Sequence, residues 1–433
     1  MPIQSAVAAP SGAQARAVPL HGAPVVATGV HGAAPTDAQC RAAIRVPCYS
    51  PQEIRTAYGL NGLIAKDGGR GQTIVIIDSY GSPTVAADLA QFDADFGLPA
   101  PPSLKVLAPL GSVPFNPAGV DQLGWAEETS LDVQWSHAMA PQAGIVVLTS
   151  PVDETEGVQG LPEFLQLEQY AVAHHLGNII SQSWAATENS LFTPQGEALI
   201  ARFNHFYRSA TLRGVTFLGS TGDAGTGNPG VDGTVYPFPT VNFPSTSPWV
   251  TAVGGTSLNA TTSGVYQSET VWNDGIGDAT GGGISQYIPE PWYQRLLPRA
   301  TQTLLAGHRA VPDVAFNADP KTGVLVYLGF LGGANNGYYI FGGTSEGSPS
   351  WAGIVADLDQ RAGFALGFLN PTLYVLGASH LISGVLRDVT VGNNAQPPIP
   401  GYSAGPGWDA TTGWGTPNLS LFANSFIARA RHG

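Results

Sequence analysis

Apolar residues follow two alternating patterns along this chain: short runs rich in β-branched residues, and longer stretches in which they recur at helical spacing. The clearest short run is residues 72–78 (QTIVIID), which predicts a buried parallel strand. Further strands are predicted at residues 144–149, 178–183, 215–219 and 250–253, and helices at 85–96, 164–175 and 197–212. The chain is therefore expected to alternate between strands and helices.

This alternation predicts an α/β fold, with a doubly wound, mostly parallel sheet and helices on both of its faces. Ligands of such sheets bind beyond the carboxyl ends of the strands. Asp78, Trp184, Asp223 and the turn that contains Ser345 all fall at or after predicted strand ends. Their shared position favours a functional interpretation of each.

Residues 342–353 (GGTSEGSPSWAG) form a glycine-lined turn between a predicted strand at 338–341 and a helical pattern that begins near Trp351. Glycine lets a substrate backbone approach closely, and a helix start supplies unpaired N–H groups and positive potential, which suit a developing oxyanion. Ser345 is therefore a candidate nucleophile. The alternative is a helix N-cap formed by Ser345 or Ser348.

Residues 125–140 have helical periodicity, and Glu128 and Asp132 lie one turn apart on the predicted apolar face. A solvated charged face is the usual explanation for acids on a helix, but it fits Glu127 better than these two. Two desolvated carboxyl groups at this spacing tend to share a proton, so that one can act as a base in acid. His137, the rival base, projects from nearly the opposite face and is expected at the surface or against a loop.

Asp223 follows the predicted strand 215–219 and is flanked by Gly222 and Gly225. It could hold a local turn through an Asx hydrogen bond. Alternatively, an Asp that keeps its proton in a low-dielectric site can donate a hydrogen bond to an oxyanion. No histidine stands in the sequence context of a subtilisin-type base, so a Ser-His-Asp triad is not expected.

Size and charge narrow the class of protein. The 433 residues show no long linker, which predicts one large domain at 50–433 after an N-terminal extension at 1–49 that is partly disordered. A net charge of −13 without a basic patch argues against nucleic acid as a partner, and no stretch of about 20 apolar residues spans a membrane. Cys40 and Cys48 could close a small disulfide loop, which favours an oxidising, extracellular compartment.

With these residues in view, residues 50–425 resemble the sedolisins, the serine-carboxyl peptidases that share the subtilisin fold. The matching motifs are the Gly-Thr-Ser turn that closes on Pro349, the helix that carries Glu128 and Asp132, and Gly222-Asp223. Residues 242–256 and 367–374 also match the family pattern.

The resemblance implies a role for each of these residues. Ser345 would be the nucleophile, Glu128 its general base, Asp132 the group that orients and tunes Glu128, and Asp223 the oxyanion acid. Asp78 falls where some members carry an auxiliary acid linked to the catalytic pair. Trp184 matches a Trp beside that pair.

A second group of acids lies near the C-terminus, where Asp388-Val389 is followed by the Gly-Pro-Gly segment 405–407 and then Asp409. Oxygen ligands alone suit Ca²⁺ rather than Zn²⁺, although a glycine-rich turn with incidental acids is the simpler interpretation. The resemblance implies one structural Ca²⁺ within residues 388–409, held by both Asp side chains, the carbonyl groups of Val389, Gly405 and Gly407, and water.

The expected protein is therefore a secreted, monomeric peptidase that cleaves proteins or peptides. We expect it to act in acid, because the pKa values of free Glu and Asp are near 4.3 and 3.9. Three alternatives stay open: a tripeptidyl-peptidase rather than an endopeptidase, an inactive secreted binding protein on the same fold, and a neutral-pH subtilisin. The absence of a suitable histidine disfavours the last.

Overall fold

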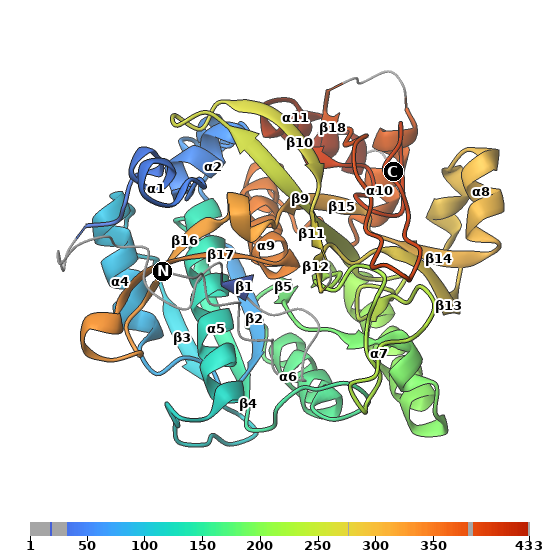
Figure 1. The fold of residues 1–433 in the computed structure, drawn as a ribbon, viewed down its shortest axis with the longest axis horizontal. Coiled ribbons are helices and arrows are strands. Elements are labelled where there is room, and N and C mark those ends of the chain that lie inside the picture. Colours follow the sequence, from blue (N-terminus) through green and yellow to red (C-terminus); the bar gives the residue numbers. More distant parts are fainter. Residues whose placement is uncertain (1–17, 20–32, 276, 380–383, 432–433) are drawn as a thin grey trace.

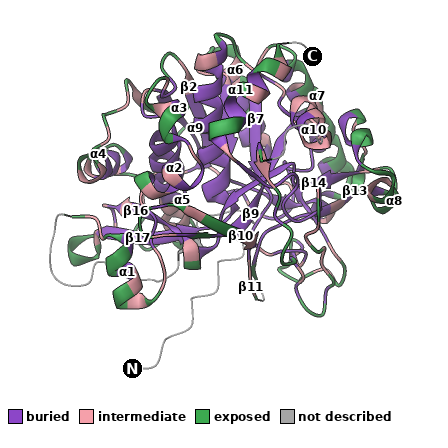
Figure 2. Ribbon diagram, turned by 90° about the horizontal axis from the view of Figure 1, so that it is seen from above, coloured by how far each residue is buried: buried purple, intermediate pink, exposed green. Residues whose placement is uncertain are grey.

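The computed structural model describes residues 18–19, 33–275, 277–379 and 384–431. The prediction that the N-terminal extension is partly disordered falls mostly on residues that lie outside this described part. Figure 1 shows the arrangement of the elements, and Figure 2 shows that the centre of the molecule, around β2, β7 and α9, is buried.

The main sheet has the strand order β10-β9-β7-β5-β2-β4-β3, with β15 also paired to β9. Its strand pairs are parallel except for β10 with β9, which are antiparallel. The predicted mostly parallel sheet is confirmed. The strands are β2 (Thr73–Ser79), β3 (Leu104–Leu107), β4 (Gly144–Ser150), β5 (Ile179–Gln182), β7 (Thr216–Ser220), β9 (Thr251–Ala260), β10 (Tyr266–Val271) and β15 (Val314–Asn317).

Helices cover both faces of this sheet, as predicted. The helices α5 (Val120–Met139) and α9 (Thr344–Ala362) pack on one face, and α6 (Leu161–Ala173) and α7 (Pro194–Thr211) on the other. Among the described residues, no helix is both long and apolar enough to cross a membrane. The other helices are α1 (Asp37–Ile44), α2 (Pro51–Ala57), α3 (Asn61–Ile64), α4 (Val85–Phe96), α8 (Arg299–Leu305), α10 (Asn370–Ala378) and α11 (Leu419–Ala430).

The alternation of side chains along β2 decides which face each residue serves. Ile74 and Ile76 belong to the core under α5 and α9, whereas Val75 and Ile77 belong to the core under α6 and α7. Because side chains alternate between the faces of a strand, Asp78 returns to the face that carries α5. The end of β2 thus places the carboxyl group of Asp78 on the face of the sheet against which α5 packs.

The helices α5 and α9 touch closely, and a glycine makes the contact possible. A Cβ atom on Gly353 of α9 would lie 2.5 Å from the Cβ of Met139 and 2.9 Å from the carbonyl oxygen of Ser136, both on α5. A larger residue at this position would push the two helices apart. The close approach sets the distance between the acids of α5 and the start of α9.

Short antiparallel strands complete the fold. β17 (Gly337–Gly342) pairs with β16 (Val324–Leu328) on one side and with β1 (Val18–Pro19) on the other. Its last residue leads directly into the start of α9. The remaining pairs are β6 (Ala186–Thr187) with β8 (Asn242–Phe243), β11 (Asn273–Gly275) with β12 (Asp278–Ala279), β13 (Gly283–Pro289) with β14 (His308–Val311), and β18 (Leu386–Arg387) with β19 (Thr416–Pro417).

The segment before residue 50 is tied to the main domain. Cys40 and Cys48 form a disulfide, with their Cα atoms 5.9 Å apart, and both are buried in the core cluster that includes α5 and α9. Arg41 donates a hydrogen bond to the carbonyl oxygen of Ala260 at the end of β9 (3.0 Å). Helix α1 and its disulfide therefore pack against the edge of the sheet.

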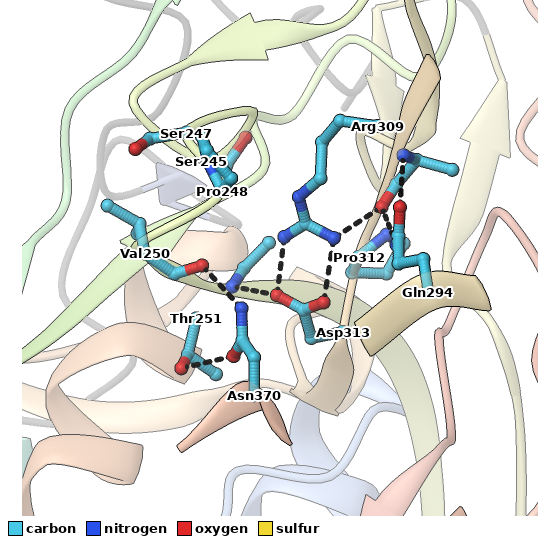
Figure 3. Close-up of polar contacts among 12 residues, drawn as sticks. Ser245, Ser247, Pro248, Val250, Thr251, Gln294, Arg309, Pro312, Asp313 and Asn370 are labelled. Carbon is cyan, nitrogen blue, oxygen red and sulfur yellow. Dashed lines mark hydrogen bonds and ion pairs between the residues drawn. The ribbon is translucent and has the colours of Figure 1, made fainter. Parts of the chain in front are cut away.

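A buried ion pair anchors the opposite end of β9 (Figure 3). Arg309 of β14 donates two hydrogen bonds to Asp313, at 2.8 and 2.6 Å, and Asp313 also accepts one from the backbone N–H of Ala252 (2.8 Å). Asn370, at the start of α10, bridges the hydroxyl of Thr251 and the carbonyl of Val250. Buried charges are tolerated when they are paired and hydrogen-bonded in this way.

Candidate active site

Ser345 lies in the first turn of α9, immediately after the turn that follows β17. Gly343 is the N-cap residue with φ of 94°, a left-handed conformation that favours glycine. The Ser345 side chain is fully buried, and its Oγ makes no hydrogen bond within the described residues. The hydroxyl therefore lies at the positive end of the helix, and no hydrogen bond in the described part of the chain gives it a structural role.

The helix-cap alternative for these serines is wrong. The cap position belongs to Gly343, and no side chain caps the helix. The Ser348 hydroxyl instead lies 2.9 Å from the hydroxyl of Ser181 and accepts a hydrogen bond from the backbone N–H of Gln182 at 3.3 Å. Ser348 fastens α9 to β5, and Ser345 has no such role.

Glu128 and Asp132 are both fully buried on α5, one turn apart. The whole helix from Trp125 to Met139 is almost entirely buried. The sequence predicted that Glu128 and Asp132 lie on one apolar face of an otherwise solvated helix, but this part of α5 has no solvated face. Burial, followed by the nearby charges of Glu128 and Asp78, raises the pKa of Asp132 well above its usual value. The two carboxyl groups therefore interact, as the spacing predicts.

Asp78 joins the same group from the end of β2. Its Oδ2 accepts a hydrogen bond of 2.8 Å from the hydroxyl of Thr129, the residue after Glu128. Burial raises the pKa of Asp78 to about 7, although the Thr129 bond opposes the shift. Three buried carboxyl groups thus converge between β2 and α5.

Ser183, which directly follows β5, connects the acids with the candidate nucleophile. Its hydroxyl donates to Oδ1 of Asp132 at 2.9 Å and lies 3.4 Å from the backbone carbonyl oxygen of Ser345. Sequence reasoning did not single out Ser183, although its place at a strand end beside Trp184 is the signal that could have identified it. The acids of α5 and the start of α9 are therefore neighbours.

Asp223 reaches the same turn from the carboxyl end of β7. Its Oδ1 accepts hydrogen bonds from the backbone N–H and the hydroxyl of Thr344, at 2.7 and 2.9 Å. The Thr344 hydroxyl in turn accepts one from the backbone N–H of Gly222 (3.0 Å). Thr344 is 121 positions away in the chain, so these two bonds are not those of a local Asx turn.

Trp184 lies on the other face of the sheet. Its ring packs against Phe164 of α6 and Phe203 of α7, with centroid distances of 4.8 and 6.1 Å. Through its neighbour Ser183 it adjoins the acids, and its auxiliary role stays a prediction.

The residues of the predicted calcium site come together in one loop region after β18. Asp388 Oδ2 accepts a hydrogen bond from the N–H of Gly407 (2.8 Å), and Asp409 Oδ2 accepts one from the N–H of Gly405 (3.0 Å). Burial and then the charge of Asp409 raise the pKa of Asp388. The charges of the two carboxylates face each other here, and carboxylate oxygens are ligands of the kind that suits a hard divalent cation.

The apolar pocket on the surface is separate from these residues. It has a volume of about 400 Å³, and Asn204 is among the residues that line it. None of the predicted site residues lines it. Its apolar lining includes Ile200, Pro248, Trp249, Tyr287, Trp292 and Phe368.

The sheet, the helices on both faces and the serine after β17 define an α/β protein with a subtilisin-like fold. Pseudomonas sedolisin, a serine-carboxyl proteinase solved in complex with two molecules of pseudo-iodotyrostatin, matches the structure with a TM-score of 0.74 and 29% identity. The match covers 89% of this chain and 99% of that one. No protein-family model matches the chain.

Sequence relatives agree with the structural match. Kumamolisin from Bacillus sp. (strain MN-32) is 37% identical over 378 residues, which cover 85% of this chain and 62% of the relative. Sedolisin from Pseudomonas sp. (strain 101) is 31% identical, covering 86% and 60%. Tripeptidyl-peptidase 1 from Homo sapiens is 30% identical, covering 79% and 58%. The chain belongs to the sedolisin family, and it spans about three fifths of the length of these relatives.

Proposed function

We propose that this protein is a serine-carboxyl peptidase that hydrolyses peptide bonds in acid. The observation that carries the proposal is the position of Ser183, whose hydroxyl links Asp132 to the backbone of Ser345 inside the core. This position supports a mechanism in which Glu128 and Asp132 of α5 act as the base for Ser345 of α9. Membership of the sedolisin family supports the same reaction class.

In the proposed mechanism Ser345 Oγ attacks the carbonyl carbon of the substrate while Glu128 takes its proton. Asp132 orients Glu128 and shares a proton with it, and Asp78 is an auxiliary acid linked to the pair through Thr129. The carboxyl group of Asp223 donates a hydrogen bond to the tetrahedral oxyanion, together with backbone N–H groups at the start of α9. Glu128 then protonates the leaving amine, and water repeats the cycle on the acyl-enzyme.

The mechanism predicts that the cleavage rate falls as the pH rises from acid to neutral. The pKa of Asp78 is raised to about 7 and that of Asp132 is also raised, so both groups hold their protons in acid and lose them as the pH rises. We expect the cleavage rate of a denatured protein substrate to be highest below about pH 6 and to fall above about pH 7. A rate that peaks only above pH 8 would contradict the mechanism.

The products of the same cleavage reactions show whether the protein removes tripeptides or cuts internally. The name of the human relative favours removal of tripeptides, whereas an endopeptidase would release internal fragments of varied length. Mass spectrometry of the products separates the two: a ladder of successive tripeptides indicates a tripeptidyl-peptidase. Products of neither kind, at every pH, would favour the non-catalytic binding protein.

We also propose that the loop region of Asp388 and Asp409 holds one structural Ca²⁺, with carbonyl oxygens of Val389, Gly405 and Gly407. Bound Ca²⁺ would neutralise the repulsion between the two carboxylates. It would also join the loop that contains Gly407 to β18. The disulfide of Cys40 and Cys48 supports an oxidising compartment, which is consistent with secretion.

Removal of calcium should lower the thermal stability. A ligand that binds only the folded state stabilises it by about 2.7 kcal/mol at a concentration 100 times its Kd. We therefore expect EDTA to lower the melting temperature by several degrees, and added Ca²⁺, but not Mg²⁺, to restore it. Asp388→Asn should respond weakly to EDTA. No response of the wild type, with no calcium found by elemental analysis, would reject the site.

A further inference from the structure

Glu346, the residue that follows the nucleophile, carries a buried carboxyl group that the proposed mechanism does not use. Its side chain is fully buried in the first turn of α9. The side-chain amide of Asn317, the last residue of β15, lies 3.2 Å from both of its carboxyl oxygens. Glu346 therefore ties the start of α9 to the sheet on the side of β15.

Asn317 is itself held on several sides. Its amide donates to the carbonyl of Thr322 (2.8 Å), and its Oδ1 accepts from the backbone N–H of Leu258 in β9 (3.1 Å). Its backbone N–H donates to the hydroxyl of Tyr58 (2.9 Å), which donates to Glu269 at 2.6 Å. A side chain fixed by this many bonds offers Glu346 a rigid partner.

The charge state of Glu346 matters because its carboxyl group is fully buried one residue from Ser345. The titratable groups that face it are Tyr58, at the end of α2, and Asp319, which follows β15. Burial raises the pKa of Glu346 well above its usual value, the hydrogen bond from Asn317 opposes this shift, and the charge of Asp319 adds to it. Ionisation would place an acidic charge beside Ser345, with the amide of Asn317 as its hydrogen-bond donor among the described residues.

We propose that Glu346 is a positioning residue: through Asn317 its neutral carboxyl group fixes the first turn of α9 and thereby the backbone of Ser345. Loss of its proton would put a negative charge into this buried turn, one residue from Ser345. Glu346 would then contribute to the loss of activity at high pH without contacting the substrate. This inference rests on the proposed peptidase function.

The test compares Glu346→Gln, which keeps a neutral group of the same shape, with Glu346→Ala. We expect the Gln variant to keep kcat within about twofold in acid and to move the high-pH midpoint of kcat upward by more than about 0.5 pH units. The Ala variant should lose kcat by about tenfold or more with KM nearly unchanged, because turnover depends on the position of Ser345. Both variants are measured on one peptide substrate between pH 3 and 8.

Asp359→Asn is the matched control. Asp359 is buried near the other end of α9, where it accepts hydrogen bonds from Asn178 and the backbone N–H of Leu366, and burial raises its pKa to about 7. The high-pH midpoint of kcat in this variant should equal that of the wild type. A wild type without cleavage at any pH would overturn the proposed function. An active wild type with an unmoved midpoint in Glu346→Gln would overturn only this inference.

Discussion

Replacement of Ser345 by Ala is expected to abolish peptidase turnover and to leave the fold intact. In the proposed mechanism Ser345 forms the acyl-enzyme, and loss of such a nucleophile costs roughly 10⁴-fold or more in kcat. Because the Ser345 hydroxyl makes no hydrogen bond within the described residues, its removal breaks no structural contact. The melting temperature should therefore stay close to that of the wild type, and both quantities are measured on the same preparation.

Ser350→Ala is the matched control for this experiment. Ser350 is a fully buried serine on the same helix, and its hydroxyl likewise has no hydrogen-bond partner among the described residues. The control should keep wild-type turnover. Activity above about a tenth of the wild type in Ser345→Ala would reject the serine as the nucleophile, whatever the control shows.

The protein should also be most stable in acid and lose stability as the pH rises. Burial raises the pKa values of Asp78, Glu188, Asp319 and Asp359 to about 7 each. A carboxyl group whose pKa is higher in the folded than in the unfolded state stabilises the fold fully below the unfolded value, near 4. That contribution is lost as the pH rises toward 7, at ~1.4 kcal/mol for each unit of pKa difference.

Thermal unfolding of Ser345→Ala, which cannot digest itself, measures this effect without proteolysis. We expect its melting temperature to fall by more than about 10 °C between pH 4 and pH 8 at constant ionic strength. Adding Asp359→Asn should make the fall shallower, because one of the groups no longer titrates. A melting temperature that is equal or higher at pH 8 would show that these carboxyl groups ionise in the folded protein without cost.

The strongly periodic elements were predictable from sequence, and the irregular ones were not. The pattern gave α4 its observed bounds, Val85–Phe96, and located each parallel strand of the central part of the sheet to within a few residues. β3 was missed because its short run LKVL is only half-buried at the sheet edge. β9 was predicted to end at residue 253 but continues through two glycines to Ala260, because β15 pairs with its middle (Val253 to Thr256) and β10 with its second half (Thr256 to Ala260).

For the site, sequence could identify the acids but not their partners. Glu128 and Asp132 were recognisable from their spacing, whereas the bonds of Ser183 and Thr344 depend on how distant strands end beside one another. His137 shows the limit of the helical count. Its predicted contact with a loop is confirmed by Pro99, but the prediction of a surface position is wrong, since the ring is fully buried beside Asp93.

The spread of the site along the chain has a consequence for biosynthesis. Asp78, Glu128, Asp223 and Ser345 come from β2, α5, the end of β7 and α9, and they meet only when the central sheet is complete. A growing chain holds all of the proposed acids long before the serine emerges from the ribosome. The proposed site can therefore form only after synthesis has passed the start of α9, and a nascent chain that ends before Ser345 holds the acids without the serine.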